Sequence, residues 1–404
     1  MRDNLRPILA EIEKVRRVDK NGKVKFEGFQ FNANVGFLLM DLDDYENINS
    51  YNKHNFIIQA LFEIGKKGPI NTKNYSRQLK LIINNYLASP ENKYKFITHI
   101  TIPKDISLPI IKDGGNTITF NPKNISNFIS SRLSLKYNNL FNCDINIPKN
   151  MATISVSVSG KNDVDAMNKS IESLDYIRGI MNFYCNNKWR ISNDYKPINA
   201  IRLGPIHSLH HYNGSLASKT FMFNSDYTED IYNKKINILD SIEKVKLRRL
   251  TINRLEYSSD IKNIMIRYVR ALDHQDFNMS ILELWGLLEY LGDPEKQYSK
   301  TAISRASVFY YNKEYFISSL AMIRKIRNKF AHTGKSIDLI ENAAYYLKSI
   351  VEKLITFYTK TEFKFCDIVE AARFLEILKE PDQIQREIMK MEYASSLGFS
   401  NNHK

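Results

Sequence analysis

The chain has little of what identifies secreted, membrane-spanning or metal-binding proteins. Its three cysteines, Cys143, Cys185 and Cys366, lie far apart and match neither metal-ligand nor redox spacing. The cleanest apolar runs, such as residues 37–40, are far too short to span a bilayer. The first seven residues contain no apolar segment typical of a secretory signal. We therefore expect a cytoplasmic protein with reduced thiols and no membrane partner.

Phosphate-binding signatures are also missing. The sequence has no Gly-rich loop of the Walker or Rossmann kind. It also lacks the Gly-Ser and downstream Asp-x-Asp pattern of a nucleotidyltransferase. These motifs therefore give no reason to expect a cofactor.

The formal net charge of +14 is unevenly distributed. From Thr251 onward, 22 Lys and Arg face 20 Asp and Glu, whereas the residues before it carry 36 against 24. A basic N-terminal part joined to a nearly neutral C-terminal part is suited to holding a polyanion while the other part does chemistry. Solubility explains the same surplus, and the sequence leaves both explanations open.

At 404 residues we expect two domains and an α+β fold. The predicted N-terminal domain is mixed α/β over residues 1–240, and an all-α helical bundle follows over residues 241–404. In the first part, the pattern predicts strands over 23–32, 35–42, 94–102, 117–120, 152–160 and 200–209, and helices over 56–65, 75–87 and 162–185. The clearest unit is the alternating strand 152–160 and the helix after it, which Asn162 and Asp163 begin.

Every pattern from about residue 241 onward is helical. We predict a charged helix or helix pair over 243–270, helices over 277–291, 299–311, 314–331, 336–358 and 367–378, and a polar, peripheral tail beyond Pro381. The segment 277–291 has the widest apolar stripe and is the predicted central helix. Gly334 is well placed to end helix 314–331 in a left-handed conformation.

The run RNKFAH, residues 327–332 at the end of that helix, is the leading candidate for a catalytic site. Asn328 and His332 are four residues apart and share a helix face with Arg324, whereas Arg327 lies about 100° around the helix. The helix dipole favours a protonated imidazole in the last turn and Arg327 opposes it, which suits His332 as an acid or base. Because 19 Arg and 8 His produce such spacing readily by chance, the spacing alone is weak evidence. The position of the run at the end of a bundle helix is the stronger support for a site.

These residue types fit the cleavage of RNA by its own 2′-hydroxyl. That reaction needs a base, an acid and positive charge on the phosphate, and it needs no metal. We assign His332 to acid or base, Arg327 to the phosphate and Asn328 to orienting either. One motif supplies one imidazole, so a dimer that brings two copies together would provide both roles.

In this context the residues resemble a HEPN domain, in particular the Apea-like HEPN group of bacterial abortive-infection and anti-phage proteins. The resemblance covers about residues 256–358 and includes the apolar helix LELWGLLE with Glu289, then Arg305, and the run RNKFAHTGK. More loosely, IRGIMNFY and IRLGPIHSL are similar to the segment that precedes such domains.

The resemblance implies an all-α HEPN-like bundle and a metal-independent endoribonuclease that leaves cyclic phosphate ends. It also implies a homodimer with a composite active site. The family's Arg, polar residue and His fall on Arg327, Asn328 and His332, with Glu289 and Arg305 as supporting residues.

Each assignment has a plainer alternative. Arg324, Lys325 and Lys329 are candidate RNA contacts, but a run of charges is as readily a solvated face. Glu289 is more often the structural partner of a buried cation than a catalytic group. An acidic turn explains Asp41 and Asp43 better than a divalent metal does, and strand-edge histidines explain His207, His210 and His211 better than zinc does.

The leading hypothesis is an RNase effector of phage defence, whose N-terminal domain senses a phage-derived or nucleic-acid trigger or positions RNA. A second is a catalytically silent module that binds RNA, nucleotide or a partner protein through the same surface. A third is a toxin that a separate antitoxin controls.

Overall fold

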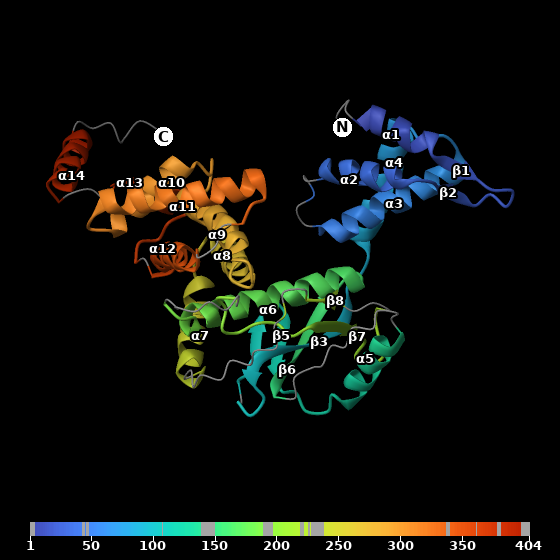
Figure 1. The fold of residues 1–404 in the computed structure, drawn as a ribbon, viewed down its shortest axis with the longest axis horizontal. Helices are drawn as coiled ribbons and strands as arrows, with labels where there is room; N and C mark the ends of the chain where they lie inside the picture. The colour runs from blue at the N-terminus through green and yellow to red at the C-terminus, as the bar shows by residue number, and fades with distance from the viewer. Residues whose placement is uncertain are drawn as a thin grey trace.

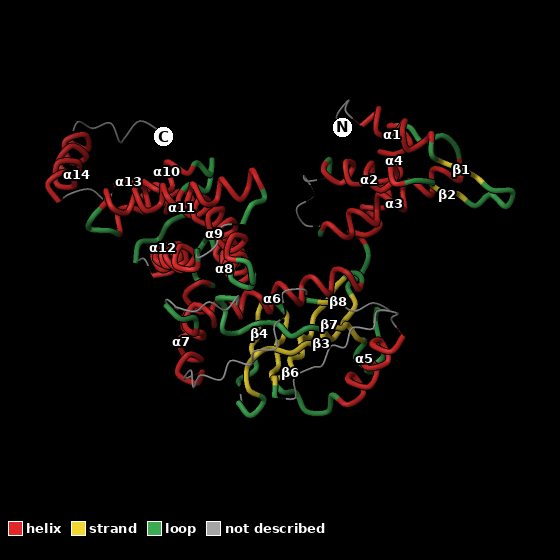
Figure 2. The backbone as a smooth tube through the Cα atoms, in the orientation of Figure 1, coloured by secondary structure: helices red, strands yellow, loops and turns green. Residues whose placement is uncertain are grey.

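The fold is α+β and consists of an antiparallel sheet with two helical bodies on the same side of it (Figures 1 and 2). The computed structural model describes residues 5–42, 45, 48–106, 108–138, 150–188, 197–218, 222–224, 227, 238–336, 340–360, 362–377 and 381–396. None of the helices in these ranges is both long and apolar enough to cross a membrane.

The N-terminal body is helical and has its own hydrophobic core. Its elements are α1 (Leu5–Lys14), β1 (Arg16–Val18), β2 (Val24–Phe26), α2 (Phe29–Met40), α3 (Ser50–Lys67) and α4 (Thr72–Ala88). The predicted helices 56–65 and 75–87 are confirmed as parts of α3 and α4. Helix α1 was not predicted from the sequence.

The strands predicted over 23–32 and 35–42 are largely wrong. Only Val24–Phe26 is a strand, and residues 29–40 form α2. Phe31, Val35 and Leu38 are buried on one face of α2, at helical spacing, while Phe37 and Met40 are exposed on the other. Because apolar residues occupy both faces, the helical period is hidden in the sequence. The alternative metal site at Asp41 cannot be followed, since Asp43 lies outside the described residues.

The sheet has six strands in the order β4-β5-β6-β3-β7-β8 and every pair is antiparallel. Its strands are β3 (Asn92–Pro103), β4 (Ile111–Asp113), β5 (Asn116–Phe120), β6 (Met151–Gly160), β7 (Ile206–His210) and β8 (Met222–Phe223). Two helices accompany it, α5 (Ser126–Asn138) and α6 (Asp163–Cys185).

The predicted unit of strand 152–160 and the helix after it is confirmed. The side chain of Asn162 caps α6 by accepting a hydrogen bond from the backbone N–H of Asp165 at 2.8 Å. The strand predicted over 200–209 is confirmed only from Ile206, and α5 was not predicted.

The C-terminal body is the predicted helical bundle. It contains α7 (Ile238–Ile252), α8 (Ser258–Ala271), α9 (Phe277–Gly292), α10 (Ser299–Ala306), the 3₁₀ turn η1 (Ser307–Phe309), α11 (Lys313–Thr333), α12 (Glu341–Lys360), α13 (Ile368–Ile377) and α14 (Pro381–Ser396). The central position of α9 is confirmed, because Leu284, Trp285 and Leu288 are fully buried. The tail beyond Pro381 forms helix α14, which was not predicted. From residue 382 onward its side chains are exposed or half-buried.

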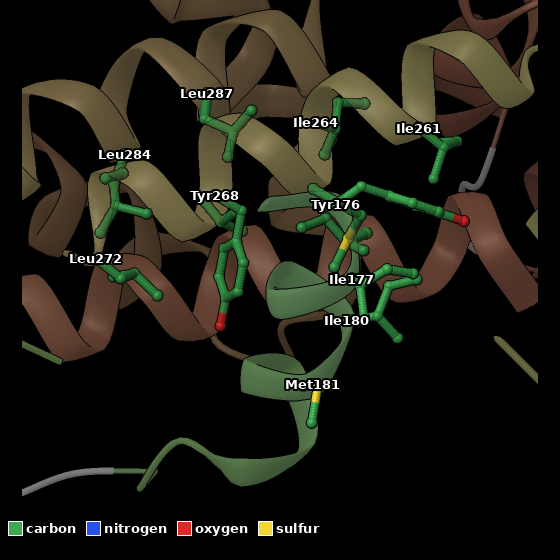
Figure 3. Close-up of a cluster of buried hydrophobic side chains, with 14 of the residues drawn as sticks. Tyr176, Ile177, Ile180, Met181, Ile261, Ile264, Tyr268, Leu272, Leu284 and Leu287 are labelled. Atoms are coloured by element: carbon green, nitrogen blue, oxygen red, sulfur yellow. The ribbon is translucent and has the colours of Figure 1, made fainter. Parts of the chain in front are cut away.

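A continuous core joins the sheet to the bundle through α6. Tyr176 and Ile180 of α6 point into the same apolar cluster as Tyr268 of α8 and Leu284 of α9 (Figure 3). Beside this cluster, the buried guanidinium of Arg178 contacts Asp175 at 2.6 Å and Asp273 at 2.8 Å. The core of the N-terminal body is separate. The domain boundary near residue 240 stays a prediction.

Candidate active site

The candidate site lies at the end of α11, which the sequence delimits clearly. The side chain of Asn312 caps the first turn by accepting from the backbone N–H of Tyr315 at 2.9 Å. Phe316, Leu320 and Ile323 form the buried face of the helix. Gly334 ends it with φ 63°, and its N–H donates to the carbonyl of Phe330 at 2.8 Å, as predicted for a left-handed cap.

Arg327 is held on two sides within the bundle. Its Nη1 donates to Oδ1 of Asn328 at 3.0 Å, and its Nη2 lies 3.8 Å from Oε2 of Glu289 on α9. Its Nε is buried and has no hydrogen-bond partner among the described residues. The guanidinium is therefore oriented while it keeps hydrogen-bonding capacity, as a group that receives an anion requires.

Glu289 is in turn fixed from its own side of the bundle. Its Oε1 accepts from the indole Nε1 of Trp285 at 2.8 Å and from the hydroxyl of Ser299. Since Oε1 is occupied in this way, Oε2 faces Arg327. The structure thus brings together Glu289, Arg327 and Asn328, three of the residues singled out from the sequence.

Trp285 and Ser299 also belong to the site and were not predicted as site residues from the sequence. Trp285 precedes Glu289 by four residues, a spacing at which helical side chains meet, so this contact could have been predicted from the spacing. Ser299 reaches Glu289 only because α10 packs on α9, and no local pattern reports that.

His332 lies in the last turn of α11 and is exposed. Among the described residues, no hydrogen bond or ion pair is found for its imidazole, so the ring is free to meet a ligand. The side chains of Arg324, Lys325 and Lys329 are exposed on the same helix. They have no carboxylate within ion-pair distance in the described ranges.

Arg305 belongs to a different part of the bundle. Its Nε and Nη2 donate to Oε1 of Glu376 at 2.9 and 2.6 Å, and its Nη1 donates to the carbonyl of Gly292 at 2.8 Å. Asp293 lies 3.6 Å away. These contacts tie α10 to α9 and α13, and none of them involves Arg327 or His332.

Of the three histidines considered as a zinc site, His207 and His210 instead contact hydroxyl groups of the sheet. Nδ1 of His207 lies 2.6 Å from the Thr98 hydroxyl, and Nε2 of His210 lies 2.9 Å from the Ser208 hydroxyl. Burial lowers the pKa of His207 to about 3 and that of His210 to about 4. Both lie in β7, which pairs with β3 and β8 and is not an edge strand, whereas His211 is exposed beyond it. Within the described ranges, no cluster of three or more His, Cys, Asp or Glu is arranged to hold a metal ion.

No protein-family model, curated protein or solved structure matches this chain.

Proposed function

We propose that this protein is a metal-independent endoribonuclease of the HEPN type, acting as a homodimer. The observation that carries the proposal is the presence of an oriented guanidinium and an exposed imidazole in the last two turns of one helix. Arg327 is held by Glu289 and Asn328, and His332 follows it by five residues. The guanidinium binds the scissile phosphate, and the imidazole transfers a proton to or from the 2′- or 5′-oxygen.

The dimer follows from the number of imidazoles. Cleavage through the 2′-hydroxyl uses a base and an acid, and one copy of the motif supplies one histidine. One exposed face of α11 also carries apolar residues, since Tyr315 and Met322 are seven residues apart and their side chains are 66% and 59% exposed. A second copy packed on this face would cover them and bring a second His332 beside the first. Phage defence is the biological setting that we propose for this activity.

The activity is tested by incubating the purified protein with RNA in EDTA and analysing the ends of the products. We expect 2′,3′-cyclic phosphate ends and a loss of at least about 10²-fold in rate for His332→Ala, the usual contribution of a proton-transfer group. Arg327→Ala is expected to lose a similar amount. His211→Ala, which removes an exposed histidine of the sheet region, is the matched control and should cleave at the wild-type rate.

Wild-type cleavage rates in both motif variants would refute the assignment. Loss of RNA affinity in both variants, with no cyclic ends from wild type, would instead favour the silent binding module.

The dimer is tested separately by Met322→Glu, with Met389→Glu on the exposed α14 as its control. We expect a monomer in sedimentation and loss of cleavage for Met322→Glu only. A monomeric wild-type protein with full activity would contradict the composite site.

A further inference from the structure

A pocket away from the RNKFAH motif lies where the end of α6 meets α12. It has a volume of about 620 Å³, within the range of roughly 300–1,000 Å³ typical of small-molecule sites. Its lining combines three aromatic rings, three lysines, two hydroxyls and one carboxylate: Phe183, Phe309, Phe357, Lys188, Lys353, Lys360, Ser349, Thr356 and Glu352. The site described above uses none of these residues.

The rings provide a partly exposed apolar surface of fixed geometry. The centroids of Phe309 and Phe357 lie 5.8 Å apart. Phe183 is held by the guanidinium of buried Arg248, whose centre is 4.8 Å from the ring centroid. Rings of this kind stack on any planar base, because every base has a π-face.

The charge in the pocket is positive once its surroundings are counted. Oε1 of Glu352 is paired with the buried ammonium of Lys348 at 2.9 Å and also accepts a hydrogen bond from the Tyr268 hydroxyl, and neither partner lines the pocket. Lys348 therefore neutralises the charge of this carboxylate. Lys188, Lys353 and Lys360 are exposed and have no carboxylate within ion-pair distance among the described residues.

The lysines are spaced for a chain of phosphates. Lys353 and Lys360 are seven residues apart on α12, so two turns, or about 10 Å of helix axis, separate their Cα atoms on one face. The ammonium of Lys353 is held 3.8 Å from the centroid of the Tyr310 ring. Side chains that project from one helix face at this separation can contact neighbouring phosphates of one polyphosphate.

The free carboxylate oxygen supplies the remaining element. Oε2 of Glu352 has no hydrogen-bond partner among the described residues and belongs to the lining. It can accept from an amino or ring N–H group of adenine or guanine.

We propose that this pocket binds a purine nucleoside di- or triphosphate. The base stacks on the phenylalanine rings, Glu352 accepts from its edge, and Lys188, Lys353 and Lys360 bind the phosphates. The ligand then contacts both α6 of the sheet and α12 of the bundle. This site is independent of the proposed RNA cleavage.

The test is calorimetric titration of the full-length protein with ATP and GTP, and with inorganic triphosphate and a ten-residue oligoadenylate as separate arms. The double variant Lys353→Glu/Lys360→Glu changes exposed side chains only, and circular dichroism checks that it folds. Lys296→Glu, an exposed lysine of the same bundle outside the pocket, is the matched control.

We expect ATP or GTP to bind, with an affinity at least about tenfold lower in the double variant, as for loss of charged hydrogen bonds. Affinity should be unchanged in Lys296→Glu. The proposal is overturned if neither nucleotide binds at millimolar concentration, or if inorganic triphosphate binds as tightly as both. Binding of oligoadenylate alone, lost in the double variant, would overturn it in favour of an RNA strand. Because binding is measured without cleavage, an inactive nuclease site leaves this result intact.

Discussion

Replacing Gly179 with alanine should loosen the junction between the sheet and the bundle. A Cβ atom at Gly179 of α6 would lie 2.5 Å from the carbonyl oxygen of Met265 on α8 and 3.1 Å from its carbonyl carbon. Both are backbone atoms and cannot rotate away as a flexible side chain does. The two helices must therefore move apart, and the apolar contacts between them weaken.

The expected magnitude is the difference between two effects. Overpacking of this kind costs typically about 1–3 kcal/mol, and alanine in place of glycine returns about 1 kcal/mol of helix propensity. The free energy of unfolding should therefore fall by up to about 2 kcal/mol. Gly286→Ala on α9 is the matched control, because the nearest atom to its Cβ would be Nη2 of Arg267 at an ordinary 3.7 Å. That variant should gain stability.

Both variants are measured by urea unfolding, followed by circular dichroism and by the fluorescence of buried Trp285. A lower midpoint for Gly179→Ala and a higher one for Gly286→Ala is the expected pattern. If Gly179→Ala gains as much stability as Gly286→Ala, the backbones of α6 and α8 are not in close contact at Gly179, and α6 does not join the sheet and the bundle in one shared core.

Three further predictions concern charged and titratable groups. Glu289→Gln keeps the shape of the side chain but removes the charge opposite Arg327, so RNA cleavage should fall roughly tenfold as the guanidinium loses its orientation; an unchanged kcat/KM would exclude a positioning role. Arg305→Met leaves the buried carboxylate of Asp293 without its cation and should cost about 3 kcal/mol of stability in urea unfolding, while the folded variant still cleaves RNA. Burial lowers the pKa of His207 to about 3 from an ordinary value of 6.5, so the unfolded chain takes up a proton that the native chain does not. The contribution of neutral His207 to the free energy of unfolding is complete above pH 6.5 and is lost as the pH falls towards 3, by about 1.4 kcal/mol per pH unit. His207→Gln should therefore make the free energy of unfolding depend less steeply on pH in this range; an equally steep dependence would disprove the low pKa of His207.

The elements predicted correctly from the sequence are those with one buried face and a clear terminus. Helix α6 has Asn162 as its cap, and α11 has Asn312 before it and Gly334 after it. Where both faces of a helix are apolar, as in α2, the period is lost and a strand was predicted instead. Short strands such as β8 depend on pairing with β7 and have no local pattern of their own.

The candidate site likewise combines features that a local sequence pattern shows with contacts that only the fold creates. The spacing of Arg327, Asn328 and His332 can be read from one helix, since the three residues lie within two turns of it. The contact between Arg327 and Glu289 joins α11 to α9, and Glu289 stands out in the sequence only through the resemblance to HEPN domains. The hydroxyl of Ser299 that fixes Glu289 comes from a third helix, α10. The motif therefore names the groups that carry the proposed chemistry, but their orientation depends on packing among three helices, which no local sequence pattern encodes.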